Sequence, residues 1–334
     1  MELIVPEYYH QFRCIASECP DSCCKEWAVD VDDASAALYR VLPGSLGDRL
    51  RQVLTDTEDG VVMTIENGRC PMWQEDGLCR IQAELGHDAL CKVCQTFPRL
   101  RHDYGEFVEF GLELSCPEAA RLILSAPTDA VQITQIPDGE PADDPEILAI
   151  LCRSRDAALA FLESDTYSLP QALAILLLYG HDVQAELDGD IPAHLDPAAL
   201  LAEATKYAAS GDVSLIVRFL QGLEILTPQW GRRLAAGHAD PIWPAEARRF
   251  VRYMVRRYWL QAVADFDLIC RVKFIISACL LVCHLGDHFI ENAQLFSKEI
   301  ENDPDNVDAL LDSAYTDPAF SDVHLLSLLL CPTL

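Results

Sequence analysis

Basic side chains are scarce in this sequence. Its 334 residues include 25 Lys and Arg against 53 Asp and Glu, which gives a formal net charge of −28. Such a charge repels the phosphates of nucleic acids and the anionic surface of membranes. We therefore expect neither nucleic acid nor a membrane as a partner. The charge favours a cationic partner or a lysine-bearing substrate, although solubility alone would also explain it.

The sequence also lacks a long apolar run and a basic start. Its longest apolar run, Phe274 to Cys283, is far shorter than the roughly 20 residues that cross a bilayer. No Lys or Arg precedes Arg13, whereas a secretory signal opens with basic residues and continues with an apolar stretch. We therefore expect a cytoplasmic protein, whose thiols stay reduced.

Strand patterns are nearly absent beyond residue 145. An acidic stretch over 128–146 contains no Lys or Arg, and this change of composition predicts a domain boundary. Helical patterns follow over 145–163, 169–180, 196–209, 212–226, 243–261, 264–300, 305–314 and 318–330. We predict a mainly α protein, with a small cysteine-rich α+β unit over 1–126 and an all-α helical domain over 145–334.

Short elements alternate with cysteines in the first unit. The pattern predicts strands near 27–32, 61–66 and 107–114, with a helix cap at Asp32 or Asp33 after the first strand. Helical patterns cover 34–56, broken at Pro43-Gly44, and 78–86, which Gly86 ends. A further helix over 117–125 is predicted to open on a capping Ser115.

Cysteines crowd the first 116 residues, which hold nine of the fourteen. They are Cys14, Cys19, Cys23, Cys24, Cys70, Cys79, Cys91, Cys94 and Cys116. In a reducing compartment this density indicates metal binding or catalysis rather than disulfides. We interpret the scattered Cys152, Cys270 and Cys331 as small apolar side chains of the core.

Spacing leaves zinc and an iron–sulfur cluster both open. A structural zinc site usually shows paired knuckles, and only Cys91/Cys94 and Cys19/Cys23 come close. The adjacent Cys23 and Cys24 do not easily bind one tetrahedral ion, whereas a cluster spreads its ligands over several iron corners. The Cys-x₃-Cys-x₂-Cys signature common in radical enzymes is absent.

The chain resembles the flagellin lysine-N-methylase family (FliB). The matching pieces are Cys14; Cys19, Cys23 and Cys24 with Trp27 and Asp30; Cys70-Pro71; Gly77-Leu78-Cys79 with Ile81 and Leu85-Gly86; Cys94 with Pro98-Arg99; Ser115 to Ala119; and Leu295 to Glu301. The resemblance is dense over 12–122 and sparse beyond. Departures are Met72-Trp73 in place of a Phe-Leu pair, and Cys91, which lies outside the pattern.

This resemblance implies an enzyme that transfers methyl groups from S-adenosylmethionine to lysine side chains of flagellin and carries a [4Fe–4S] cluster. No Gly-rich turn resembles a Rossmann methyltransferase, so the cofactor would use another kind of site. Short loops with Pro and Gly turns favour convergence of the two thiol groups. The candidate metal ligands are Cys19, Cys23, Cys24, Cys79 and Cys94, then Cys14, Cys70 and Cys116, with Cys91 the weakest.

Other side chains have two interpretations each. Arg99 would bind a carboxylate of the cofactor or acceptor, or form a structural ion pair. Glu118 would accept a lysine proton or cap its helix. Trp27 and Trp73 would shield the cluster and form the dry wall of a lysine pocket, or pack in a core.

Two groups near the C-terminus also have a default structural interpretation. Cys279, Cys283, His284 and His288 lie at helical spacing and could hold a second metal, but a buried helix is the simpler explanation. Glu299 and Glu301 could contact substrate lysines, but solvated helix charge is the default.

Two further classes of function remain open. One is a non-catalytic cysteine-rich module that binds zinc or iron. The other is a redox or cluster-carrier protein whose helical domain serves as a docking surface.

Overall fold

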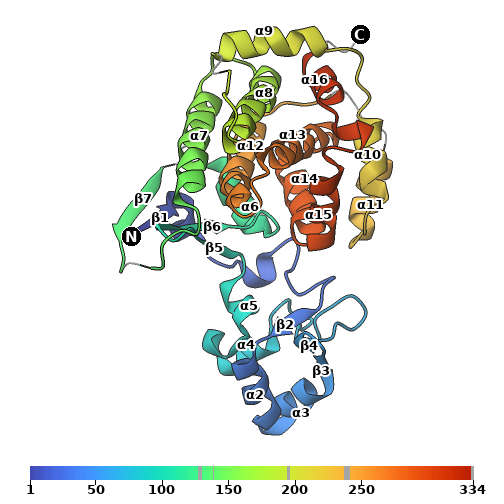
Figure 1. Cartoon of the computed structure of the whole chain (residues 1–334). Coiled ribbons are helices and arrows are strands. Elements are labelled where there is room, and N and C mark those ends of the chain that lie inside the picture. The colour runs from blue at the N-terminus through green and yellow to red at the C-terminus, as the bar shows by residue number, and fades with distance from the viewer. Residues whose placement is uncertain (127–129, 138, 194–195, 237–240, 332–334) are drawn as a thin grey trace.

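The computed structural model describes residues 1–126, 130–137, 139–193, 196–236 and 241–331. Figure 1 shows a large, mostly helical lobe and a small lobe joined by a narrow connection. The small lobe contains β2 (Val29–Val31), α2 (Asp33–Val41), α3 (Gly44–Val53), β3 (Leu54–Thr57), β4 (Gly60–Met63), α4 (Arg80–Leu85) and α5 (Lys92–Thr96).

The small lobe is organised around a three-stranded antiparallel sheet in the order β2-β4-β3. Asp32 caps α2 by accepting the backbone N–H of Ser35 at 3.1 Å, which satisfies one of the unpaired donors of the first turn. The lobe has a hydrophobic core of its own, which includes Val29, Val31, Tyr39, Leu50, Val53, Met63, Met72, Ile81 and Leu90. Cys70 and Cys91 belong to this core.

A second sheet, accompanied by two helices, packs against the helical lobe. These strands and helices come from both ends of the first 135 residues. They are β1 (Glu2–Pro6), α1 (Glu7–Gln11), β5 (Arg99–Asp103), β6 (Phe107–Leu112), α6 (Pro117–Ser125) and β7 (Val131–Gln135). The strand order is β5-β6-β1-β7, with β1 parallel to β6 and antiparallel to β7. This sheet therefore differs from the parallel sheet of a Rossmann fold.

The remaining elements are helices. They are α7 (Pro145–Glu163), α8 (Leu169–Leu187), α9 (Pro197–Tyr207), α10 (Ser214–Gln221), α11 (Pro228–Ala235), α12 (Ala245–Tyr258), α13 (Leu268–His284), α14 (Phe289–Phe296), a π-helical turn (Ser297–Glu301), α15 (Pro304–Ser313) and α16 (Asp322–Leu330). Every residue of α13 is buried, and α8 and α12 pack against it. No helix within the described residues has the length and apolar character needed to cross a membrane.

The predicted fold class is confirmed: a mixed, cysteine-bearing first part precedes a long run of helices. The two hydrophobic cores, however, do not follow the boundary predicted in the sequence. Leu112, Leu114 and the buried face of α6 belong to the core of the helical lobe, although they precede the acidic stretch. That stretch itself contains β7, which pairs with β1.

Local expectations differ from the structure at three places. The helix predicted over 264–300 is divided, because Gly286 and His288 both adopt a positive φ between α13 and α14. Ser115 does not cap α6: Cys116 occupies the cap position, and the Ser115 hydroxyl donates to Glu113 at 3.2 Å. The strands β1, β3, β5 and β7 were not expected.

Candidate metal centre

Three of the candidate thiols occupy the same structural position. Cys79, Cys91 and Cys116 stand at the N-terminal caps of α4, α5 and α6. The backbone N–H groups of Ile81 and Gln82 point to the Cys79 sulfur, and the first turn of α6 directs its own N–H groups to Cys116. Such N–H groups favour a negatively charged sulfur, because they are unpaired donors at the positive end of the helix.

Cys24 connects the two groups of thiols. Its thiol hydrogen-bonds to the sulfurs of both Cys23 and Cys70. Interaction with these two sulfurs raises the pKa of Cys24 and lowers the pKa values of Cys23 and Cys70; for Cys70 the pKa falls to about 7. The backbone is linked at the same point, where Cys70 N–H donates to the Cys24 carbonyl at 2.8 Å.

The other candidate thiols interact electrostatically with this group. Cys91 and Cys94 hydrogen-bond each other, which lowers the pKa of Cys91 and raises that of Cys94. Burial raises the pKa values of Cys19, Cys79 and Cys116, and the charge of Cys23 adds a smaller increase to these three and to Cys94. Cys14 is exposed. Among the candidate thiols with a shifted pKa, Cys19 is the one whose pKa the charge of Cys14 raises further.

The arrangement is not that of a closed single-ion site. Among the described residues, no three Cys, His, Asp or Glu side chains form a group that could hold one metal ion. A single zinc ion binds sulfur at about 2.3 Å, whereas an iron–sulfur cluster accepts thiolates at corners spread over a larger body. The donor set, composed of cysteines that receive backbone N–H groups, suits a sulfur-bound, negatively charged group.

Lys298 holds the first thiol loop against the helical lobe. Its ammonium lies 2.8 Å from Asp21 Oδ2, 2.7 Å from Glu26 Oε2 and 5.2 Å from the centre of the Trp27 ring. The same charge contributes to the lowered pKa of Cys23, after the hydrogen bond from Cys24. Lys298 was part of the predicted motif but received no role, although it is the only Lys or Arg after Lys273 in the sequence.

The two tryptophans are already in contact with the protein's own cations. Lys298 lies over Trp27, while Lys25 and Arg69 lie 5.3 and 4.7 Å from the centre of the Trp73 ring. Arg99 forms similar contacts, with the rings of Tyr9 at 5.9 Å and Phe12 at 5.2 Å. A role for Arg99 in cofactor binding stays a prediction.

The remaining candidates have structural partners. Cys279 and Cys283 hydrogen-bond each other inside α13. Glu118 binds Arg121 at 2.6 Å instead of capping its helix. The interpretation of Glu299 and Glu301 as solvated charges is wrong.

Both carboxylates are buried in the helical lobe, where each has a partner of its own. Glu299 accepts the backbone N–H of Leu226 at 2.8 Å. Glu301 binds Arg257 at 3.0 Å.

Fold and thiols together define the class: a mainly helical protein with a cysteine-rich lobe and a mixed sheet in place of a Rossmann domain. No family model and no solved structure matches the chain. It is 33% identical over 135 residues to the flagellar biosynthetic protein FliU of Salmonella muenchen, and the match covers 76% of that protein. The chain belongs to the family of FliU and the lysine-N-methylases, so the predicted resemblance is confirmed.

Two proteins named lysine-N-methylase extend this relationship. Those of Salmonella typhimurium and Salmonella choleraesuis are each 32% identical over 143 residues, which is 39% of this chain. The match spans about a third of their own length, 34% in both cases.

Proposed function

We propose that this protein transfers methyl groups from S-adenosylmethionine to lysine side chains of flagellin, with a [4Fe–4S] cluster held by its cysteines. The observation that carries the proposal is the family relationship to lysine-N-methylase and the flagellar protein FliU. The thiol centre, built from segments 14–24, 70–79, 91–94 and 116, supports the cysteine-ligated part.

Among the thiols, Cys23, Cys24, Cys70 and Cys79 are our first choice as ligands. Cys24 and Cys70 are linked by a hydrogen bond, and the charges of Cys70 and Cys23 both act on Cys79. When bound, a [4Fe–4S] cluster supplies one-electron chemistry. Lys298 would stabilise the negative charge of the bound thiolates, because its ammonium already acts on Cys23.

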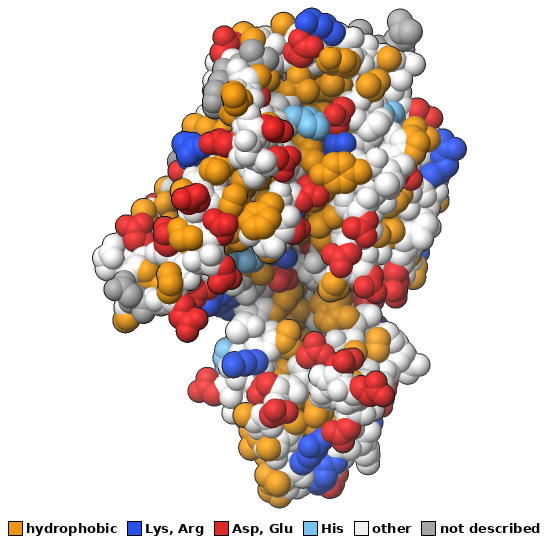
Figure 2. Space-filling view, viewed as in Figure 1, with side chains coloured by type: hydrophobic (Ala, Val, Ile, Leu, Met, Phe, Trp, Pro, Cys, Tyr) orange, Lys and Arg blue, Asp and Glu red, His pale blue; other side chains and the backbone are white. Residues whose placement is uncertain are grey.

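The charge of the surface supports a cationic protein substrate. Figure 2 shows acidic side chains spread over the visible face of both lobes, with fewer Lys and Arg between them. A net charge of −28 attracts lysine-rich segments and speeds their encounter, more so at low salt. The reacting amine must still lose its proton, so the field assists binding rather than the chemical step.

We also propose a cytoplasmic location. All fourteen cysteines are free in the structure. A reducing compartment keeps such thiols free and available to a metal.

The decisive experiment is co-expression with the flagellin of the same organism, followed by mass measurement of its lysine peptides. We expect methyl additions with the natural protein and with Cys331→Ser, whose thiol lies outside the candidate centre. We expect their loss with Cys24→Ser. Unmodified flagellin in all three cultures would contradict methylation.

A second function is a metal-binding module without methyl transfer. It is favoured by the small lobe, which carries a hydrophobic core of its own around Cys70 and Cys91. Two measurements separate the candidates. Visible absorption of the anaerobically purified protein would indicate an iron–sulfur cluster, whereas a zinc protein would be colourless. Binding of S-adenosylmethionine would indicate the enzyme rather than the metal-binding module.

A further inference from the structure

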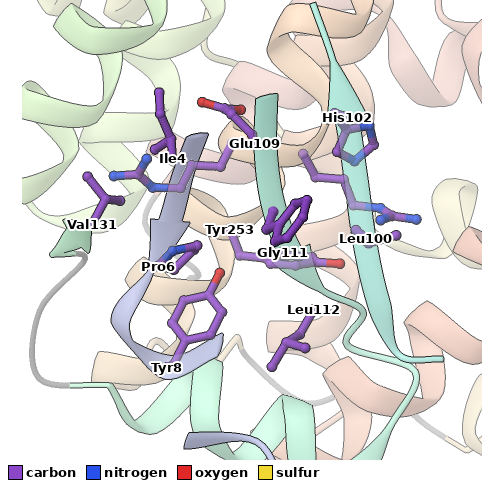
Figure 3. A pocket seen from close by; sticks show the side chains of 13 residues that line it. Ile4, Pro6, Tyr8, Leu100, His102, Glu109, Gly111, Leu112, Val131 and Tyr253 are labelled. Atoms are coloured by element: carbon purple, nitrogen blue, oxygen red, sulfur yellow. The ribbon is translucent and has the colours of Figure 1, made fainter. Parts of the chain in front are cut away.

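A small cavity lies between the second sheet and helix α12, away from the thiols. Its volume is about 50 Å³. Figure 3 shows it bordered by β1, β5, β6 and α1, with Tyr253 reaching it from α12. Apolar side chains form much of the wall: Ile4, Pro6, Leu100, Phe110, Leu112 and Val131.

Polar atoms without partners border this cavity. The hydroxyl of Tyr253, Nη1 of Arg257 and Nε2 of His102 are all buried and have no hydrogen-bond partner. Tyr253 is only 7% exposed. A buried polar group left unpaired costs about 1 to 3 kcal/mol, so three around one cavity indicate a ligand that pairs with them.

The three groups are suited to an anion. Tyr253 and Arg257 present hydrogen-bond donors, and His102 donates or accepts according to its tautomer. Burial, with the nearby Arg257, lowers the pKa of His102, so its ring is neutral at pH 7. Arg257 binds Glu301 through Nε at 3.0 Å, which leaves Nη1 available to a ligand.

The nearby carboxylates do not provide a cation site. Glu109 lines the cavity, but Arg155 holds both of its oxygens, at 2.7 and 2.8 Å. Burial raises the pKa of Glu113, which lies within the field of Arg257. The lining also contains the guanidiniums of Arg256 and Arg257, which can donate hydrogen bonds to an anion.

We propose that this cavity binds a carboxylate group attached to a small apolar body. The planar guanidinium of Arg257 matches a carboxylate, Tyr253 donates a second hydrogen bond, and the apolar wall receives the hydrocarbon. The cavity accommodates the head group and a few carbons, because one water needs only about 10–15 Å³ on the same measure. Two sources have this chemistry: a free short-chain acid, or the amino-acid end of an adenosylated cofactor.

The test is titration calorimetry of the full chain with butyrate at constant ionic strength, with butyramide as the neutral probe of the same shape. We expect saturable binding of butyrate and at least tenfold weaker binding of butyramide. Tyr253→Phe removes only the unpaired hydroxyl, so it should weaken butyrate about tenfold while the melting temperature is kept. Tyr315→Phe removes an exposed hydroxyl that donates to Asp267 far from this cavity lining, and it should leave the butyrate affinity unchanged.

A competition experiment distinguishes the two sources. Displacement of butyrate by S-adenosylhomocysteine, weakened in Tyr253→Phe, would assign the carboxylate to the cofactor. Binding of butyrate without displacement would assign it to a separate acid. Equal binding of butyrate and butyramide, absence of saturable binding, or an unchanged affinity in Tyr253→Phe would overturn the proposal. None of these measurements needs flagellin or a metal, so methyl transfer is tested separately.

Discussion

The ammonium of Lys298 lies 2.8 Å from the carboxylate of Asp21, although 277 residues separate them in the sequence. The contact joins the π-helical turn of the large lobe to the loop that carries the first four thiols. Gln294 reinforces it by donating to the same Asp21 carboxylate at 3.5 Å. The position of the thiol loop therefore depends on the helical lobe.

Removing this cation should destabilise the protein. In Lys298→Met, Glu26 loses its ion-pair partner and Asp21 keeps only Lys25 at 3.4 Å and Gln294 at 3.5 Å. Breaking a fully buried pair costs about 3–5 kcal/mol. The two carboxylates keep 25% and 22% exposure, so we expect a smaller loss than that range, about 2–3 kcal/mol, in the free energy of unfolding. Urea denaturation measures the change.

The matched control for that variant is Lys206→Met, which breaks the exposed pair with Glu203. We expect it to leave the unfolding midpoint nearly unchanged, since exposed pairs contribute little. Equal midpoints for both variants would show that the Lys298 contacts do not hold the loop.

Loss of Cys24 should lower metal binding. Cys24→Ser removes the thiol that interacts with Cys23 and Cys70, and with it a candidate thiolate ligand. After anaerobic purification and reconstitution with iron and sulfide, we expect less than half of the natural iron content and visible absorption. Cys331→Ser should retain both. Full iron content in Cys24→Ser would exclude this residue as a ligand.

Breaking the buried ion pair of Arg155 and Glu109 should destabilise the protein far more than breaking the exposed pair of Arg153 and Glu186. Arg155 is 6% and Glu109 12% exposed, and two hydrogen bonds join them. Arg155→Met leaves a buried carboxylate unpaired, so we expect a loss of about 3–5 kcal/mol in urea denaturation. Arg153→Met breaks a pair whose arginine is 62% exposed and should have a small effect. A small effect of both would contradict this assignment.

Acid should weaken the contacts of Asp322. Although burial raises its pKa, the hydrogen bond with His181 at 2.8 Å and the ion pair with Lys273 at 2.9 Å lower it to about 2, from an ordinary 3.8. A depressed pKa means that the stabilisation is present above pH 3.8 and is lost as the pH falls toward 2. Asp322 is 36% exposed, so solvent screening leaves an expected contribution of about 1 kcal/mol.

Asp322→Asn checks this prediction. Urea denaturation at pH 5, 3.5 and 2.5 should show a stability difference from the natural protein that is largest at pH 5 and shrinks with acid. A difference that stays constant over these pH values would mean that the carboxylate charge contributes nothing.

Several helices could be predicted because their signals lie within a few residues. Helix α7 begins at Pro145 and ends at Glu163, as expected, and the Asp144 side chain accepts the N–H of Ile147 at 3.1 Å. Helix α6 likewise covers the predicted 117–125. Capping and helical periodicity act between residues three or four apart, so the linear sequence contains the information.

The candidate centre could be predicted in composition but not in arrangement. The density of cysteines indicated a sulfur site, and in the structure the Cys70 backbone N–H donates to the Cys24 carbonyl at 2.8 Å, across 46 residues. Spacing did not reveal that Cys79, Cys91 and Cys116 share the helix-cap position, because that depends on where each short helix begins.

The sequence by itself determined the fold class, the helices with strong caps and the family. Only the tertiary structure decided which charges are buried and what they meet. Lys298, Glu299 and Glu301 have the composition of a solvated helix end, yet all three are buried. The reason is physical: strands such as β1 and β7, and pairs such as Lys298 with Asp21, form between residues more than a hundred positions apart. Burial and pairing at such separations follow from how the whole chain packs, which no local pattern encodes.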